Sequence, residues 1–353
     1  MISLSQLTST LDANAQRYTR VTLAGDMSLI VAERGARIFG PFLADGTPLC
    51  WINPALGSAD TFRAFIANGE WNQGGERVWI APEIQFNIPD RARFWETHRI
   101  VPQMDPGAFR LMASESGVRL EAEMQLEAFN LARGMVDVKA RHDITTVVPN
   151  PLRQTRQGAA LMEGVAYAGY SRSVSLSLPQ PGSILCEAWC LIQLNPGGTL
   201  TIPVTSESAE ATTYFGDPAP DSQAVVDGAL RIHLTGQRQY KLGYKAAYIT
   251  GRMGYLNHLP DGRGFFLIRN FFNNPSSVYA EEPDNQPGAN GHSVHVYNDG
   301  GQYGSNGEME CNGRTIGGET GRSHTQDDFI MWVYVGAVDA LKQIGRVLLG
   351  VSL

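Results

Sequence analysis

The feature that most constrains the fold of this chain is an alternation of apolar and polar residues at every second position. Successive side chains of a β-strand point to opposite faces, so such a pattern predicts a strand with one face in a core and the other in water. Segments 136–140 and 174–178 also alternate in this way. The longest example, residues 118–127, has apolar side chains at Val118, Leu120, Ala122, Met124 and Leu126, and a polar residue follows each of them.

Other runs of β-forming residues predict further strands, and clusters of Gly, Pro, Asn and Asp separate most of them. These runs are 21–23, 28–32, 184–194, 199–204, 229–234, 264–272 and 293–297. Helical periodicity is scarce, although residues 340–348 repeat apolar side chains with the spacing of one helix face. The chain shows no βαβ alternation and no repeat of fixed period. We therefore predict an all-β fold, a large antiparallel sandwich with a short C-terminal helix, as a single domain over residues 1–353.

Charge and composition exclude several classes of partner. The net charge is −7 and no run of Lys or Arg occurs, so neither nucleic acid nor an anionic membrane surface is an expected partner. The most apolar stretch, residues 329–338, is too short to span a bilayer. The first residues lack the features of a secretory signal, which predicts a cytoplasmic protein. The four cysteines show no C-x-x-C spacing, which argues against zinc and redox motifs.

Residues 74–83, GGERVWIAPE, interleave charged and aromatic side chains in a predicted strand. If Val78 and Ile80 point to one face, Arg77 and Trp79 point to the other. A guanidinium beside an indole suits a sugar, because the ring covers its apolar C–H face while the charged group binds its hydroxyls or a carboxylate. A structural Arg–Glu pair with the tryptophan in the core explains the same pattern equally well.

A second constellation is GEMEC, residues 307–311. In a strand, Glu308 and Glu310 share one face, about 7 Å apart at their Cα atoms, while Met309 and Cys311 point into a core. In a concave surface, burial can raise the pKa of one carboxyl so that it acts as general acid or base, while the other positions ligand hydroxyls. The alternative is an ordinary solvated strand face.

Two histidines, His292 and His295, lie in a predicted strand at an offset of three, which sends them to opposite faces and argues against a two-histidine metal site. One of them is a candidate proton donor in the same cleft as Glu310. The surrounding segment 273–328 is rich in Asn, Asp, Gly and Pro, and we expect it to belong to a site. No nucleophile elbow, P-loop, zinc-protease or dinucleotide motif occurs, and no cofactor or metal is expected.

The order of these motifs resembles the aldose 1-epimerase (galactose mutarotase-like) superfamily. The residues that carry the resemblance are GARI at 35–38, LCWIN at 49–53, GGERVW at 74–79, and Glu310 on a late strand followed by a final strand and a helix. The narrower similarity is to an uncharacterised mutarotase-like branch with the motif G-G-[DE]-R-x-W-x-x-P-E. The resemblance implies one antiparallel supersandwich, a concave face that binds a mono- or oligosaccharide, and isomerase activity.

In mutarotases a glutamate takes the proton of the anomeric hydroxyl while a histidine protonates the ring oxygen; the ring opens and recloses on the other face. Residues 309–311 match the L-E-T motif of the family, so the resemblance implies Glu310 as the base. It implies Arg77 as a contact of the sugar hydroxyls. The acid histidine of the family is missing, because Trp189 stands near its place in CEAWCLI, residues 186–192.

Three histidines remain as candidate acids. His98 is a loose counterpart of a second family histidine, and the other two candidates are His258 and His295. The full set of site predictions is Glu310, His295 and His98 as catalytic residues and Arg77, Trp79, Glu83, Glu308, Trp189 and His258 as substrate contacts. Two rival functions fit the same residues: a glycoside hydrolase or lyase that uses paired carboxylates, and a sugar-binding module without catalysis.

Overall fold

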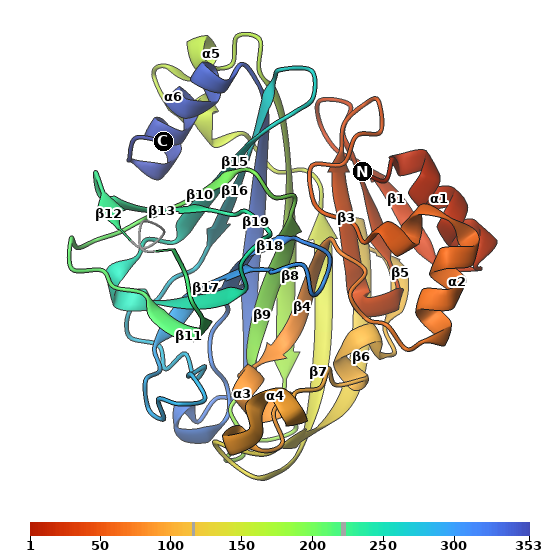
Figure 1. Ribbon diagram of the computed structural model, residues 1–353, viewed down its shortest axis with the longest axis vertical. Coiled ribbons are helices and arrows are strands. Elements are labelled where there is room, and N and C mark those ends of the chain that lie inside the picture. The colour runs from red at the N-terminus through yellow and green to blue at the C-terminus, as the bar shows by residue number, and fades with distance from the viewer. Residues whose placement is uncertain (115–116, 220–223) are drawn as a thin grey trace.

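The computed structural model describes residues 1–114, 117–219 and 224–353 (Figure 1). In this part of the chain the strands form two antiparallel sheets, one of nine and one of ten strands. The order of the first sheet is β1 (Tyr18–Thr22), β2 (Ser28–Ala32), β3 (Arg37–Phe42), β4 (Glu76–Ala81), β9 (Glu187–Leu194), β18 (Gly307–Asn312), β17 (His292–Asn298), β14 (Tyr240–Lys245) and β11 (Thr212–Gly216).

The second sheet contains the longest strands, including the strand whose alternation is clearest in the sequence. Its order is β12 (Val225–Val226), β13 (Ala229–His233), β10 (Thr199–Pro203), β15 (Arg252–His258), β16 (Gly264–Phe271), β19 (His324–Gly336), β8 (Ala166–Ser177), β7 (Gly134–Thr145), β6 (Gly117–Ala128) and β5 (Arg110–Ser114). Burial in β6 alternates along almost its whole length, because its apolar residues face the first sheet. The predicted antiparallel sandwich is confirmed.

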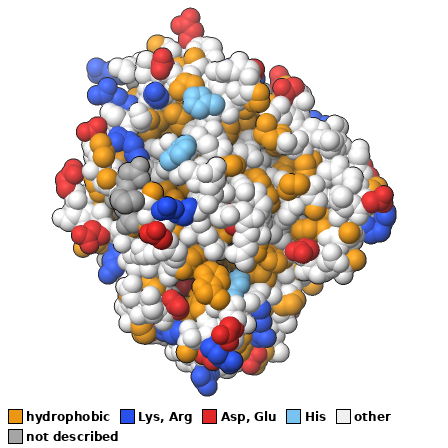
Figure 2. Space-filling model, in the orientation of Figure 1, with side chains coloured by type: hydrophobic (Ala, Val, Ile, Leu, Met, Phe, Trp, Pro, Cys, Tyr) orange, Lys and Arg blue, Asp and Glu red, His pale blue; other side chains and the backbone are white. Residues whose placement is uncertain are grey.

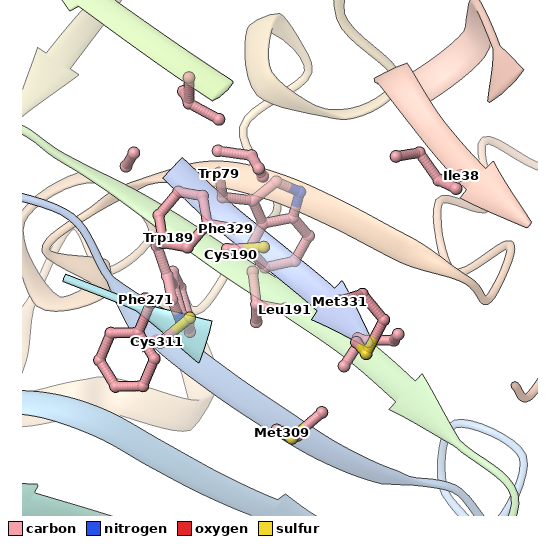
Figure 3. Close-up of a cluster of buried hydrophobic side chains, with 14 of the residues drawn as sticks. Ile38, Trp79, Trp189, Cys190, Leu191, Phe271, Met309, Cys311, Phe329 and Met331 are labelled. Carbon is pink, nitrogen blue, oxygen red and sulfur yellow. The ribbon is translucent and has the colours of Figure 1, made fainter. Parts of the chain in front are cut away.

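The main core lies between the two sheets and draws apolar side chains from both of them. In the first sheet, the inward positions alternate with outward positions along each strand, as the pleat of a strand requires. Figure 3 shows part of this core, in which Cys190, Met309 and Cys311 of the first sheet accompany Phe271, Phe329 and Met331 of the second. All four cysteines are buried and free.

Helices cover parts of the outer faces of both sheets (Figure 1). On the first sheet, α1 (Leu4–Ala13) and α2 (Ala59–Ala67) pack with residues of β2 and β3 in a second apolar cluster. On the second sheet, α6 (Val338–Leu349) packs Leu341, Ile344 and Leu348 against β16 and β19. Shorter helices are α3 (Glu83–Phe86), α4 (Phe94–Thr97) and α5 (Gly158–Leu161). None of the helices described is long and apolar enough to cross a membrane.

The C-terminal helix was predicted from its periodicity and is confirmed, but α1 and α2 are helices that the sequence pattern did not reveal. In α1 only Leu4, Leu7, Thr10 and Leu11 are buried, and polar residues separate them. A capping box fixes its start: the Ser3 side chain accepts from the backbone of Gln6, and the Gln6 side chain accepts from the backbone of Ser3. Because α1 and α2 cover only the β2–β3 part of the first sheet, the outer face around β4, β9 and β18 stays open for a site.

Candidate functional site

Strand β4 presents two different faces, as its alternation predicted. Val78 and Ile80 point into the core, and Arg77 and Trp79 line a pocket on the outer face of the first sheet, where the buried Trp79 ring also packs with the core cluster. The strand enters the sheet through Gly74 and Gly75, which both have positive φ. A Cβ atom on Gly75 would lie 2.4 Å from the carbonyl oxygen of Ile38, so only glycine allows this close approach.

Strand β18 follows the same rule. Glu308 and Glu310 line the pocket, and Met309 and Cys311 point into the core, which confirms their predicted orientation. Strand β9 lies between β4 and β18, and Leu191 is the direct partner of both Arg77 and Glu310. The two predicted motifs therefore meet across one intervening strand, although Arg77 and Glu308 are 231 residues apart in the sequence.

The space between the lining atoms of the pocket is about 560 Å³, a volume that includes open solvent at its mouth. Eight of the eighteen lining residues are Phe, Trp or Tyr, and charged and amide side chains also reach into the pocket. The lining residues are Trp71, Arg77, Trp79, Glu83, Phe94, Trp95, His98, Ile100, Trp189, Leu191, Gln193, Phe215, Gln239, Lys241, Tyr297, Tyr303, Glu308 and Glu310.

On one side of the pocket, Arg77 and Glu308 form a buried ion pair. Two guanidinium nitrogens donate to the two carboxylate oxygens at 3.0 and 3.4 Å, and Gln193 Nε2 donates to Glu308 Oε1 at 2.8 Å. The guanidinium lies 4.3 Å from the centre of the Trp79 ring and 5.3 Å from that of Trp71. This cation–π stacking and the paired hydrogen bonds hold the Arg77 side chain in one orientation.

On the other side, Lys241 lies between two carboxyl groups. Its Nζ donates to Glu83 Oε2 at 2.6 Å and lies 4.0 Å from Glu310 Oε2. The ammonium also lies 4.3 Å from the centre of the Trp189 ring. All three charged side chains are buried or nearly so, at 4%, 13% and 1% exposure for Lys241, Glu83 and Glu310.

The two carboxyl groups next to Lys241 differ in their affinity for protons. Burial raises the pKa of Glu310 to about 8; the charge of Lys241 opposes this shift, and the charges of Glu308 and Glu83 add to it. Burial also acts against ionisation of Glu83, but the closer charge of Lys241 and the contact with His98 lower its pKa well below the ordinary value. At neutral pH, Glu83 is therefore ionised, while Glu310 exchanges its proton near that pH.

A third carboxyl group, that of Glu281, supports Glu83 from behind. Its oxygens accept hydrogen bonds from the backbone N–H groups of Glu83 and Ile84 at the start of α3. Burial raises the pKa of Glu281 to about 8, with Lys241 opposing and Glu83 reinforcing the shift. Glu281 lies in the loop-rich segment 273–328, which was expected to contribute to a site.

His98 and Trp189 both reach the pocket. His98 follows α4, and its Nε2 lies 3.5 Å from Glu83 Oε1. Trp189 Nε1 donates a hydrogen bond to Glu310 Oε2 at 2.9 Å. Trp189, which stands near the place where the resemblance implies an acid histidine, thus holds the carboxyl group of Glu310.

His292 and His295 were expected on opposite faces of their strand, and this expectation is wrong. His295 keeps the regular register and is the direct cross-strand partner of Glu310, whereas the register between β14 and β17 shifts between Tyr244 and Lys245 and brings His292 to the same face. The Tyr214 hydroxyl lies 3.1 Å from His292 Nδ1 and 3.2 Å from His295 Nε2. Burial, followed by the charge of Lys241, keeps the pKa of His295 well below its ordinary value, so this histidine is neutral. It does not line the pocket.

His258 lies elsewhere. It ends β15 in the second sheet, where its side chain is exposed, and it is not among the residues that line the pocket. The prediction that it contacts the ligand is therefore corrected: strand 252–258 belongs to the sheet on the far side of the core. Within the described ranges, no three His, Cys, Asp or Glu side chains are grouped so that they could hold a metal ion.

Sequence reasoning missed Lys241, which contacts both carboxyl groups. A signal for it exists, because Tyr240, Leu242 and Tyr244 alternate with Gln239, Lys241 and Gly243. This pattern predicts a strand with Lys241 on the outer face, and both Lys241 and Gln239 do line the pocket. Other lining residues that the prediction omitted are Trp71, Gln193, Tyr297, Tyr303, Phe94, Trp95 and Phe215.

The alternative of a buried Arg–Glu pair is realised by Arg77 and Glu308 themselves, and a second buried Arg–Glu network lies on the other face of β4. Glu76 points into the core, where Arg269 and Tyr170 donate to its Oε2 at 2.6 and 2.7 Å. Arg172 lies 3.6 Å from its Oε1. Burial alone would raise the pKa of Glu76, yet the charges of Arg269 and Arg172 lower it overall. This carboxylate ties the first sheet to the second and takes no part in the pocket.

The protein is thus a two-sheet antiparallel sandwich with a pocket on the outer face of one sheet. Aromatic rings line this pocket, and its charged side chains pair with one another. The chain belongs to the family of unknown function DUF6786, which matches residues 28–353. No curated protein matches its sequence.

Several solved structures resemble the chain at low sequence identity. A galactose mutarotase-like protein from Lactobacillus casei ATCC 334 is 11% identical, with a TM-score of 0.42 over 90% of this chain and 99% of the other. Galactose 1-epimerase from Lactobacillus acidophilus NCFM is 10% identical, with a TM-score of 0.40 over 91% and 99% of the two chains. The chemistry of the pocket has to be inferred from its own residues.

Proposed function

We propose that the protein is a carbohydrate-active enzyme of the aldose 1-epimerase type, which interconverts the anomers of a sugar bound in the pocket. The observation that carries the proposal is the contrast between two carboxyl groups beside Lys241: Glu83 is ionised, while Glu310 has a pKa of about 8. A buried carboxyl group that gains and loses its proton near neutral pH is suited to general acid–base catalysis.

The charges of the pocket favour a neutral sugar. Among the lining residues described, the fixed cations are Arg77 and Lys241, and each is paired with a carboxylate, Glu308 or Glu83. An acidic sugar or a sugar phosphate would find no unpaired cation there. A neutral pyranose would instead place its C–H face on the indole rings and its hydroxyls on the charged and amide groups.

In the proposed reaction, ionised Glu310 takes the proton of the anomeric hydroxyl. As the C1–O bond of the ring breaks, an acid gives a proton to the ring oxygen, and an open-chain aldehyde forms. Rotation about C1–C2 exposes the other face of the aldehyde. Ring closure returns the two protons to their donors, so no other reactant is consumed.

His98 is the histidine best placed to act as the acid. It lines the pocket, and Glu83 Oε1, 3.5 Å from its Nε2, can orient the imidazole ring. His295 is less suitable, because it is fully buried next to Tyr214 and its imidazole is neutral, so it lacks the extra proton of an imidazolium.

Retaining glycoside hydrolysis is a second candidate, favoured by the same pair of carboxyl groups. Because Glu83 Oε2 and Glu310 Oε2 lie 2.6 and 4.0 Å from one nitrogen, they are at most 6.6 Å apart. Retaining enzymes separate their carboxyl groups by about 5–5.5 Å and inverting ones by about 6.5–9.5 Å. In this reading Glu310 is the acid and Glu83 the nucleophile.

The proposal is tested by following fresh α-anomers of glucose, galactose and mannose to equilibrium by NMR. We expect the wild-type protein to accelerate the approach for at least one sugar, and Glu310→Gln to lower the accelerated rate by about 10²–10⁴-fold, the usual contribution of a general base. Glu123→Gln, an exposed carboxylate of β6, serves as the matched control and should leave the rate unchanged.

The same proteins should be incubated with the 4-nitrophenyl glycosides of these sugars. No release of 4-nitrophenol is expected. Release that depends on both Glu83 and Glu310, without faster anomer exchange, would replace the epimerase by a hydrolase. Exchange no faster than in buffer, with no release, would refute both enzymatic functions.

A further inference from the structure

The mouth of the pocket carries a partly exposed group of aromatic rings, which we call the aromatic rim: Phe94, Trp95 and Phe215. Trp95 is 53% exposed although it is a large apolar residue. Its ring centre lies 4.9 Å from that of Phe215, with the ring planes at 75°, and 5.0 Å from that of Phe94. In Figure 2, hydrophobic side chains gather beside a histidine in the lower half of this face.

The aromatic rim continues the wall of the pocket. All three of its residues line the pocket. The ring centre of Phe215 also lies 6.2 Å from that of Tyr297, whose ring is buried deeper in the site. A polar partner stands beside this contact: Gln239 Nε2 donates to the Tyr297 hydroxyl at 3.4 Å. Aromatic faces next to an amide are the surroundings that bind a second sugar ring outside a pocket.

The rim is held in place before any ligand binds. Arg91, which precedes α4, donates from Nε to the carbonyl oxygen of Asp284 at 2.7 Å and from a terminal nitrogen to that of Pro283 at 2.7 Å. The Thr97 hydroxyl donates to the carbonyl oxygen of Asp90 at 3.1 Å, which closes the turn around α4. A surface fixed in this way loses little conformational entropy when a ligand stacks on it.

We propose that the substrate is a neutral reducing oligosaccharide, whose reducing-end ring occupies the pocket next to Glu310 and whose next ring stacks on Trp95. The proposal rests on the proposed function for the position of the reducing end. It adds that the rim is a second subsite, so that the protein prefers chains of two or more sugars to single sugars.

Binding to Glu310→Gln, in which the proposed reaction is blocked, tests this preference. The probes are glucose and three disaccharides with glucose at the reducing end: maltose, cellobiose and lactose. We expect at least one disaccharide to bind about tenfold more tightly than glucose, as measured by titration calorimetry, because its second ring buries a C–H face on Trp95 that glucose alone does not cover.

Replacement of Trp95 should remove the gain. In the Glu310→Gln background, Trp95→Ala should lower the affinity for that disaccharide to the affinity for glucose, and it should change the affinity for glucose less than twofold. Trp95→Phe should keep most of the tighter disaccharide binding. Phe272→Ala, which changes a 59% exposed aromatic residue outside the pocket, is the control and should change neither affinity.

Any of three results would overturn the second subsite. Glucose and all three disaccharides could bind with equal affinity, or none of these probes could bind. Trp95→Ala could also weaken the binding of glucose and of the disaccharide by the same factor. The anomer-exchange experiment separates this failure from failure of the epimerase function. Exchange of glucose with no disaccharide preference refutes the subsite alone. A disaccharide preference that depends on Trp95, without exchange in the wild-type protein, refutes the epimerase alone.

Discussion

Lys241 contacts two carboxyl groups with one positive charge, and this imbalance sets the chemistry of the site. The closer group, Glu83, is stabilised as an anion. Glu310 is more distant and more deeply buried, and its pKa is raised to about 8. A second cation next to Glu310 would have lowered its pKa and removed its ability to exchange a proton near neutral pH.

The raised pKa of Glu310 predicts how stability depends on pH. Its pKa is about 8 in the folded protein and near 4.5 in the unfolded chain, so the folded state binds more protons between these values. The free energy of unfolding therefore falls as pH rises from about 5 to 9. Glu281, with a similar pKa, contributes in the same direction.

Glu310→Gln should remove the Glu310 part of this dependence. Urea unfolding at pH 6 and pH 9 should show the variant gaining stability relative to the wild-type protein at the higher pH. Because Glu281 is present in both proteins, the comparison isolates Glu310. A difference in unfolding free energy that stays constant between the two pH values would show that Glu310 does not titrate in this range.

Single residues also show where sequence reasoning succeeds. The positions of Arg77, Trp79, Glu308 and Glu310 follow from period-2 alternation, because each has apolar neighbours that must enter the core. The direction of His292 does not follow, since a register shift between Tyr244 and Lys245 brings its side chain to the same face as His295. Alternation in one strand contains no information on such a shift in the pairing with the next strand.

At the level of elements, β4 connects the site to the core. Its outer face carries Arg77 and Trp79, and its inner face carries Glu76, which binds Arg172 and Arg269 of the second sheet. Trp79 is fixed from its other side, because its Nε1 donates to Asp105 at 3.1 Å and Asp105 is paired with Arg37. The wall of the pocket is thus anchored at several points along one strand.

Glu76→Ala should destabilise the protein strongly. It leaves two buried guanidinium groups without their carboxylate, and loss of one partner of a buried ion pair costs about 3–5 kcal/mol. Urea unfolding measures this loss. Glu123→Ala is the control: Glu123 also pairs with a cation, Lys139, but both side chains are exposed, so a change within about 0.5 kcal/mol is expected. A loss below about 1 kcal/mol for Glu76→Ala would contradict this role.

The helices are the elements that the sequence predicted least well. The apolar stripe of α6 was detected, because five apolar residues recur on one face. In α1 and α2 the stripes are shorter, and their buried residues, such as Leu7 and Phe62, pack on a small area of the first sheet. Helices of about ten residues are stabilised largely by such packing, which the local pattern does not show.

At the scale of the whole molecule, the pocket exists because coverage of the first sheet is incomplete. Helices α1 and α2 close its β2–β3 part, and the second sheet closes its inner face, which leaves the outer face of β4, β9, β18 and β14 accessible. The pocket residues range from Trp71 to Glu310 in sequence. Antiparallel order could be predicted from alternation, but the pairing of β4 with β9 and of β9 with β18 could not, because these strands are far apart in the chain.

The central claim is that this pocket binds the sugar with its anomeric centre beside Glu310. A crystal structure of Glu310→Gln with maltose, or with whichever of the three disaccharides binds most tightly, tests it most directly. We predict the reducing-end ring between the Arg77–Trp79 wall and Lys241, with its anomeric hydroxyl within hydrogen-bond distance of the side chain at position 310. A sugar bound elsewhere on the protein, or bound here with its anomeric centre away from position 310, would contradict the claim.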